Sequence, residues 1–340
     1  MDSKLDLLLR SFTFYISSIL SIIRYFLTSF SRFKQIPSAF TVSDTCISLY
    51  FRLLGLSPVS IHVDDETTLH FWASRGRSGG RDRKPDDERP NLVMIHGKCG
   101  DSRWQFMYQV GHLSRRFDLY IPDLLFFGKS YTTRKERSEA FQAKCLAEGL
   151  RKLGVDRFSI YGISYGGYVG YHLAHMSPDR VEKVVLMSTG VGCNDDQKDK
   201  MVAKLGRDPK ELLVPRTSDD LRELMYKSVY KSNYMKLIPD SFLQDYLNDI
   251  GSIHRKEKME LVDHLLAKNS DAGRSLPVLA QDTLLIWGNK DYVFPMNLAY
   301  QLQRHLGSKA RVAIVKDAGH AVNMDAPDQV NRLIVSFILG

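Results

Sequence analysis

Hydrophobic positions along most of the 340-residue chain fall into short apolar runs that alternate with helically spaced segments. Uninterrupted apolar runs are typical of strands buried on both faces of a sheet, and spacings of three and four residues are typical of helices. The predicted strands are 59–65, 67–74, 91–97, 117–123, 158–164, 183–190, 283–288 and 311–317, and the predicted helices are 43–55, 103–116, 137–153, 165–176, 295–306 and 325–338. This alternation predicts an α/β fold, a parallel sheet with helices on both faces.

The alternation stops after Gly190 and resumes with the strand at 283–288. The segment 191–276 is mostly helical in pattern, and its charged residues are 15 basic and 15 acidic. An insertion between late strands of a parallel sheet lies over the carboxyl ends of the strands, where such folds bind ligands. We therefore expect residues 191–276 to form a helical cap, and residues 41–190 and 277–340 to form the core.

Residues 1–40 have a different pattern, with an apolar stretch over 7–31 that carries a narrow polar stripe at helical spacing. Three interpretations compete: a helix at or obliquely across a membrane interface, a cleaved signal or transit peptide, and a structural helix packed on the domain. The longest uncharged run is the 13 residues 11–23, so a span would place Arg24 in or near the hydrocarbon. We favour a membrane anchor or targeting segment, in an intracellular protein at the endoplasmic reticulum or a lipid surface. The alternative is an organelle-targeted protein whose amino-terminal segment is removed.

Charge and cysteine content restrict the classes of partner and cofactor. The chain has 47 Lys and Arg against 39 Asp and Glu, a net charge of +8, and three of these charges belong to residues 1–40. No array of basic and aromatic residues suggests nucleic acid, so a membrane surface is the better explanation of the excess. The four cysteines, Cys46, Cys99, Cys145 and Cys193, are widely spaced and form no C-x-x-C pair, which excludes a disulfide framework and a structural zinc site. We expect neither a metal nor a cofactor.

The sharpest chemical signal is Gly162-Ile163-Ser164-Tyr165-Gly166, which follows a predicted strand and precedes a predicted helix. A G-x-S-x-G in this position predicts a nucleophile elbow, in which a strained turn exposes the serine hydroxyl. The alternative is a glycine-rich helix start in which Ser164 is an N-cap.

A serine nucleophile needs a histidine as general base and a carboxylate that orients it. Asp291 follows the predicted strand 283–288, and His320 follows the predicted strand 311–317. Both residues belong to loops at the carboxyl ends of strands, as Ser164 does, and the order Ser, Asp, His is the one expected for this arrangement. We predict that Ser164, Asp291 and His320 form a catalytic triad.

The tetrahedral intermediate of such a reaction needs two backbone N–H donors, which form an oxyanion hole. We predict the N–H groups of Tyr165 and Lys98 as these donors, with Cys99 the second choice in the loop after 91–97; no base is placed to make Cys99 a rival nucleophile. The spacing from His320 to Asp325 is H-x-x-x-x-D, which is associated with acyltransferases. We favour the simpler interpretation that Asp325 caps the last helix.

These residues together resemble the α/β-hydrolase superfamily over about 59–340, through His96-Gly97, the segment 122–130, the elbow, 287–295 and 319–327. Within it the chain is similar to plant serine hydrolases related to monoacylglycerol lipases. The resemblance implies a mostly parallel, eight-stranded sheet with a cap after strand six, and it implies the triad roles given above. The sequence departs from many relatives in having Lys98 and Cys99, not an apolar residue, after His-Gly, which changes the polarity of the pocket mouth.

We therefore expect a serine hydrolase that cleaves a carboxylic ester of a small lipophilic substrate, such as a monoacylglycerol, through an acyl-enzyme on Ser164. Carbon–carbon hydrolysis and cyanohydrin cleavage also use this fold and are minor alternatives. Two further alternatives use the same residues. One is an acyltransferase with the same triad, and the other is a small-molecule receptor of slow turnover on the same fold.

Overall fold

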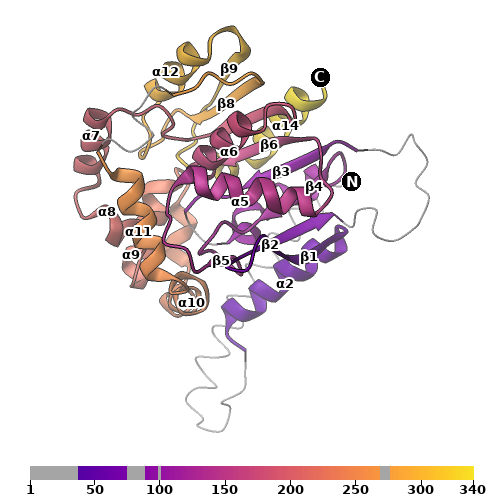
Figure 1. Cartoon of the computed structure of the whole chain (residues 1–340). Helices are drawn as coiled ribbons and strands as arrows, with labels where there is room; N and C mark the ends of the chain where they lie inside the picture. Colours follow the sequence, from indigo (N-terminus) through magenta and orange to yellow (C-terminus); the bar gives the residue numbers. More distant parts are fainter. Residues whose placement is uncertain (1–36, 75–88, 99–100, 269–275) are drawn as a thin grey trace, which may run out of the picture.

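A mostly parallel sheet of nine strands forms the centre of the protein in the computed structural model, which describes residues 37–74, 89–98, 101–268 and 276–340 (Figure 1). The strands are β1 (Leu56–His62), β2 (Thr67–Ser74), β3 (Asn91–Ile95), β4 (Asp118–Pro122), β5 (Tyr131–Thr132), β6 (Phe158–Ile163), β7 (Val181–Met187), β8 (Asp282–Gly288) and β9 (Ala310–Val315). Their order is β1-β2-β4-β3-β6-β7-β8-β9, and β5 pairs with β2. The strands β3, β4 and β6 to β9 pair in parallel, whereas the pairs of β2 are antiparallel. The predicted α/β class is confirmed, with β5 as one short strand beyond the expected eight.

Two hydrophobic clusters cover the two faces of the sheet, because successive strand residues point to opposite sides. Val93 and Ile95 of β3 belong to one cluster, and Leu92 and Met94 belong to the other. The first cluster contains side chains of α5 (Glu139–Lys152), α6 (Tyr165–Met176) and α12 (Asn297–Leu306), and the second contains side chains of α2 (Ala39–Leu53), α4 (Val110–Leu113) and α14 (Pro327–Leu339). Helices therefore lie on both faces of the sheet, and the loops with the predicted site residues lie at the strand ends.

One predicted helix is interrupted in the structure, and another begins later than predicted. The helix expected at 103–116 is split into α3 (Ser102–Phe106) and α4, since the chain turns at Gln109, whose buried side chain donates to the carbonyl of Asn323. The helix expected at 325–338 is α14, which begins two residues later than predicted, and the short helix α13 (Val322–Asp325) precedes it. Pro327 is the first residue of α14, and Ala326 before it is not helical (φ −141°, ψ 56°), because a proline disfavours the helical conformation of its predecessor.

Helices fill the chain between β7 and β8, as the helical patterns of 191–276 predict, and Figure 1 shows them together at one side of the sheet. These cap helices are α7 (Asp195–Leu205), α8 (Pro209–Leu213), α9 (Ser218–Ser228), α10 (Asp240–Tyr246) and α11 (Arg255–Leu266), with the 3₁₀-helix η2 (Asn233–Leu237) and the π-helix η3 (Leu247–Gly251) between them. The 3₁₀-helix η5 (Gly307–Lys309) lies before β9. An ion pair between Arg137 and Glu260, 2.8 Å long, joins α11 to the core.

An aromatic cluster connects the first described helix to the cap. The ring of Phe40, in α2, stacks on Trp104 of α3 at a centroid distance of 5.3 Å. Phe242 and Tyr246 of α10 meet Phe40 edge-on, each at 5.6 Å. Because edge-to-face and offset pairs stabilise beyond the area they bury, α2 holds α10 against the core.

The amphipathic helix predicted over 7–31 lies outside the described residues. Among the helices of residues 37–74, 89–98, 101–268 and 276–340, none is both long and apolar enough to cross a membrane.

The aromatic cluster predicts a stability difference between two substitutions in α2. Phe40 is 1% exposed, so Phe40→Ala should lower the free energy of unfolding by about 3–5 kcal/mol through lost contacts and the cavity it leaves. Leu53 is 77% exposed on the same helix, and Leu53→Ala should change stability by less than about 0.5 kcal/mol. Urea unfolding of both variants measures the difference, and equal costs would contradict the role given to the cluster.

Candidate active site

The backbone at Ser164 has a conformation that L-residues rarely adopt. Strand β6 ends at Ile163, Ser164 has φ 52° and ψ −114°, and α6 begins at Tyr165. A Cβ atom at Gly162 would lie 2.5 Å from the carbonyl oxygen of Gly166, and one at Gly166 would collide with the carbonyl oxygen of Ile95. The two glycines thus let the chain pass close to itself, which permits a turn that projects the Ser164 hydroxyl from the sheet edge.

The structure brings Ser164, His320 and Asp291 into one hydrogen-bonded chain. Nε2 of His320 lies 3.0 Å from Oγ of Ser164, and Nδ1 of His320 lies 3.1 Å from Oδ2 of Asp291. The side chain of Asp291 is fully buried and that of His320 is 11% exposed. With Nδ1–H donating to the carboxylate, Nε2 is the acceptor for the serine hydroxyl, which is the arrangement of a general base.

Asp291 is held in place by the chain that follows it. Its Oδ1 accepts hydrogen bonds from the N–H groups of Val293 at 2.8 Å and Phe294 at 2.9 Å, while Oδ2 faces His320. The ring of Phe294 also packs on the imidazole, with centroids 5.4 Å apart. The position of His320 is therefore fixed by a hydrogen bond on one side and an aromatic contact on another.

The loop after β3 lies directly against the nucleophile. A Cβ atom at Gly97 would lie 3.2 Å from Cβ of Ser164, and the N–H of Gly97 donates to Oε1 of Gln105. Lys98 is the next residue in this loop, and Tyr165 begins α6, so its N–H has no acceptor within the helix. The oxyanion role of the Lys98 and Tyr165 N–H groups stays a prediction that this arrangement permits. Cys99 lies outside the described residues.

A buried polar network holds the loop after β3 in place. Nδ1 of His96 lies 2.6 Å from the carbonyl oxygen of Gly97, and Nε2 accepts from the N–H of Leu124 at 2.9 Å. Oδ2 of Asp123 lies 2.9 Å from Nδ1 of His70, and Oδ1 of Asp123 accepts a hydrogen bond from the hydroxyl of Ser102 at 2.6 Å. Sequence reasoning missed this network, although Asp123 directly follows a buried strand, as the triad members nearly do.

Two titratable groups of the network, His96 and Asp123, have pKa values shifted in directions that keep its hydrogen bonds intact. Burial lowers the pKa of His96, and the nearby Asp123 charge opposes the shift only in part. Burial alone would raise the pKa of Asp123. The hydrogen bonds of this carboxylate to His70 and Ser102 outweigh the effect of burial and lower the pKa to about 2. A neutral imidazole and an ionised carboxylate are what the observed hydrogen bonds require.

Asp325 does not cap the last helix, contrary to our expectation. The N-cap of α14 is Ala326, and the buried carboxylate of Asp325 accepts instead from three backbone N–H groups. Gly319 donates to Oδ2 at 2.8 Å and Tyr230 at 3.0 Å, while Lys231 donates to Oδ1 at 2.8 Å. Asp325 therefore links the residue before His320 to the cap, a role that the H-x-x-x-x-D spacing does not indicate.

The same connection continues on the other side of His320. The N–H of Ala321 donates to the carbonyl oxygen of Ser228, the last residue of α9, at 2.7 Å. A Cβ atom at Gly319 would lie 2.9 Å from that oxygen. The loop that carries His320 thus packs directly on the chain that leaves α9.

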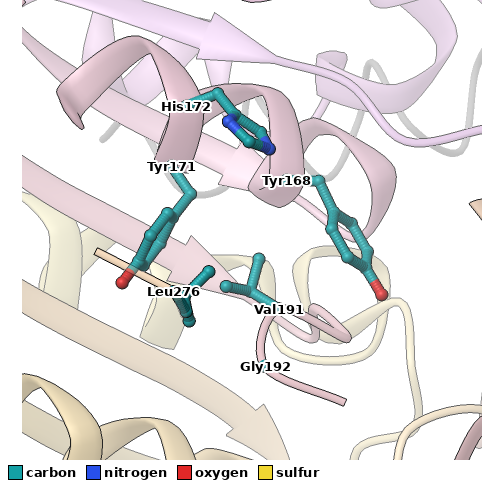
Figure 2. A pocket seen from close by; sticks show the side chains of 6 residues that line it. All are labelled: Tyr168, Tyr171, His172, Val191, Gly192 and Leu276. Carbon is teal, nitrogen blue, oxygen red and sulfur yellow. The ribbon is translucent and has the colours of Figure 1, made fainter. Parts of the chain in front are cut away.

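The other candidate sites are two buried cysteines, possible metal ligands and a hollow beside α6. Burial raises the pKa of the Cys145 and Cys193 thiols to about 12, which leaves both cysteines unreactive at neutral pH. Within the described ranges no group of three or more His, Cys, Asp or Glu side chains is arranged to hold a metal ion. A hollow beside α6 has a volume of about 10 Å³. Figure 2 shows the residues that line it, Tyr168, Tyr171, His172, Val191, Gly192 and Leu276. It has room for about one water molecule, and none of the triad residues lines it.

Comparisons with known proteins identify the family of this fold. The family model described as the alpha/beta hydrolase fold matches residues 90–327. The chain is 29% identical over 262 residues to a 2-hydroxy-6-oxononadienedioate/2-hydroxy-6-oxononatrienedioate hydrolase from Paraburkholderia xenovorans, which covers 73% of this chain and 86% of that one. It is 25% identical over 307 residues to a monoacylglycerol lipase from Mus musculus, which covers 84% of each chain. Among solved structures, a bacterial membrane phospholipase A superposes with a TM-score of 0.71 at 19% identity, over 93% of this chain and 95% of that one.

The lowered pKa of His96 predicts a loss of stability in mild acid. A neutral histidine in the folded state and one of pKa about 6.5 in the unfolded state contribute stability above about pH 6.5, which is lost as the pH falls toward the folded pKa. The free energy of unfolding should fall by up to about 1.4 kcal/mol per pH unit from this group. Urea unfolding at pH 7.5 and 5.5 measures it, with His96→Asn as the variant that lacks the titration. An equal pH dependence in both proteins would contradict the prediction.

Asp325 should affect the reactivity of Ser164, because its carboxylate fixes the loop that carries the base. Asp325→Asn replaces one acceptor oxygen with a donor that faces backbone N–H groups, so the rate of fluorophosphonate labelling should fall at least about tenfold. Asp328→Asn, an exposed matched change in α14, should label at the wild-type rate. Wild-type labelling of Asp325→Asn would show that the contact does not position His320.

Proposed function

Because the chain belongs to the α/β-hydrolase family, we propose that it is a serine hydrolase that cleaves a carboxylic ester of a lipophilic substrate through an acyl-enzyme on Ser164. One observation carries this proposal, the hydrogen-bonded chain from Ser164 through His320 to Asp291, with distances of 3.0 and 3.1 Å. A serine, not a carboxylate, at the elbow supports acyl transfer to a hydroxyl.

In the proposed reaction, His320 Nε2 accepts the proton of Ser164 as Oγ attacks the ester carbonyl. The N–H groups of Lys98 and Tyr165 stabilise the resulting oxyanion, an effect worth roughly 10²–10³ in rate for each donor. His320 then gives the proton to the leaving alcohol, and a water molecule activated by the same imidazole hydrolyses the acyl-enzyme. Asp291 stabilises the imidazolium in both steps.

The cap supports the lipophilic part of the proposal. Most side chains that line the space between the cap and Lys98 are apolar, among them Leu213, Val214, Leu221 and Leu224. The similarity to a monoacylglycerol lipase agrees with a glycerol ester as a substrate.

We also propose that residues 7–31 associate with a membrane surface inside the cell. The apolar stretch and its cationic stripe support this, and so does the packing of the following helix α2 on cap helix α10. The cap would then lie near the lipid phase from which a lipophilic ester arrives.

Cleavage of a carbon–carbon bond is a second candidate, favoured by the similarity to the hydrolase of 2-hydroxy-6-oxononadienedioate. Such hydrolysis also ends in acyl transfer to water. An ester panel run beside a 2-hydroxy-6-oxodienoate separates the two reactions by their kcat/KM values.

Substitution of Ser164 tests the proposed function. Ser164→Ala should abolish fluorophosphonate labelling and lower ester turnover on the order of 10⁶-fold, and Asp291→Asn should lower it roughly 10⁴-fold. Ser241→Ala, at an exposed serine of the cap, should behave as wild type. A chain-length panel of esters, in detergent and in vesicles, supplies the rates.

Other results with this protein would indicate a different nucleophile or a different function. Turnover retained by Ser164→Ala would exclude Ser164 as the nucleophile. Capture of the acyl group by an added alcohol faster than by water would indicate an acyltransferase. Thermal stabilisation by a ligand with negligible turnover would indicate a receptor.

A further inference from the structure

The part of the cap between α9 and α10 has a charge pattern of its own. The sequence has no Asp or Glu between Glu223 and Asp240, and this stretch contains Lys227, Lys231 and Lys236. The cap as a whole, by contrast, has 15 basic and 15 acidic residues. The stretch is therefore a basic part of an otherwise balanced cap.

Two large hydrophobic side chains of this stretch face solvent. Tyr230 is 49% exposed, and Leu237, in η2, is 68% exposed. Lys231 and Lys236, the sequence neighbours of these two residues, are exposed as well. Single exposed hydrophobic residues are common on soluble proteins, but here two of them lie with two lysines in one short segment. We call residues 230–237 the basic loop.

The inner side of the basic loop is fixed to the rest of the protein. Met235 is 1% exposed and belongs to a hydrophobic cluster with Val229 and Ala321, so it packs on the loop that carries the base. The guanidinium of Arg222, in α9, donates to the carbonyl oxygens of Met235 at 2.6 Å and Ile238 at 2.8 Å. These contacts hold η2 in one orientation.

The burial of Met235 decides which side of η2 faces solvent. A 3₁₀-helix has three residues per turn, so the two residues that follow Met235 point to other sides of the helix. These residues are Lys236 and Leu237, and both are exposed. The fold thus presents a basic and an apolar side chain together at the surface of the cap.

The acidic side chains that contact this part of the cap are bonded to other groups. Asp240 forms an ion pair with Arg222 at 2.6 Å. The carboxylate of Asp325 is buried under the basic loop and accepts from the N–H groups of Tyr230 and Lys231. The ammonium of Lys231 donates to the main-chain carbonyl of Asp325 at 3.2 Å. The outer face of the basic loop is therefore positively charged.

The basic loop also lies near the point where the amphipathic stretch joins the described chain. Ile238, directly after the basic loop, and Phe242 of α10 pack against the same cluster of buried leucines in the cap. The ring of Phe242 meets Phe40 at 5.6 Å, and Phe40 belongs to the first turn of α2 (Figure 1). A surface that already holds residues 7–31 would therefore be close to the basic loop.

A lipid bilayer suits this surface better than a protein does. Protein interfaces are depleted in lysine, whereas surface-bound segments of membrane proteins combine lysines with tyrosine and leucine. Lysine ammonium groups are attracted to anionic headgroups, and a leucine beside them is buried at the boundary of the acyl chains. The observed side chains are those two kinds.

We propose that residues 230–237 are a membrane-docking surface for bilayers that contain anionic lipids. Leu237 and Tyr230 enter the headgroup region, and Lys231 and Lys236 contact lipid phosphate or carboxylate groups. This inference extends the proposed membrane association of residues 7–31 to the cap, and it holds for any substrate of Ser164.

Acetylation of lysines in the full chain measures the contact locally. The protein is treated briefly with sulfosuccinimidyl acetate, with or without vesicles of phosphatidylcholine and about one third phosphatidylserine, and each lysine is quantified by peptide mass spectrometry. Acetylation of Lys236 should slow at least about fivefold on these vesicles, and less on phosphatidylcholine alone, because anionic lipid attracts the basic loop. Lys309, exposed before β9 at the sheet edge opposite to the triad, should keep its rate.

Two matched variants assign the protection to the basic loop. Leu237→Glu puts a negative charge where the side chain would enter the lipid, so Lys236 on vesicles should again react within about twofold of its rate in solution. Val278→Glu makes a similar change at a side chain that is 60% exposed before β8, and it should leave the protection intact. Both positions are exposed, so both variants should hydrolyse a soluble 4-nitrophenyl ester at the wild-type rate.

Flotation of the same samples separates the possible failures. Protein that floats with the vesicles but leaves Lys236 at its solution rate would overturn the inference and leave the role of residues 7–31 intact. Equal protection in Leu237→Glu would also overturn it, since the loop would then be shielded without entering the lipid. Protection that appears without vesicles and rises with protein concentration would indicate a second copy of the chain as the partner and overturn it. Protein that does not float would overturn both membrane proposals and leave ester hydrolysis intact.

Discussion

The left-handed backbone at Ser164 is the constraint on which the rest of the site depends. A residue with φ 52° between a buried strand and a helix is strained, and it persists only when the surrounding structure determines it. Here Gly162 lies against the carbonyl oxygen of Gly166 in the same turn, and Gly166 lies against the carbonyl oxygen of Ile95. The N–H of Ser164 donates to the carbonyl oxygen of Met187 at 2.9 Å. The strained turn thus lowers the stability of the fold and exposes one hydroxyl at the sheet edge.

A second layer of contacts keeps the partners of that hydroxyl in place, and much of it comes from outside the core. The loop of His320 is bonded to the chain after α9 on both sides, through Asp325 and through Ser228. The aromatic cluster around Phe40 joins the same cap to α2. The cap is therefore more than a cover, because the position of His320 and the shape of the space between the cap and Lys98 both depend on how the cap packs on the core.

Local signals made much of this predictable. Buried strands appear as apolar runs, so the sheet followed from the sequence, and Ser164, Asp291 and His320 each come soon after such a run, which places them at one edge. The break at Gln109 and the role of Asp325 did not follow, because both depend on partners far along the chain. Asp325 accepts from Tyr230, 95 residues away, and no spacing in the sequence encodes that contact. The small cavity that Lys98 and Lys258 line likewise forms only when the cap packs on the loop after β3.

The central claim is that Ser164 carries the acyl group during turnover, and its most direct test is mass spectrometry of a rapidly quenched reaction. The protein is mixed with an excess of a 4-nitrophenyl ester, quenched in acid within the first turnover, digested and sequenced. The account predicts an acyl mass increment on the peptide that contains Ser164, which forms and decays with the burst of nitrophenol. A burst with the increment on a different residue, or turnover with no covalent adduct, would contradict it.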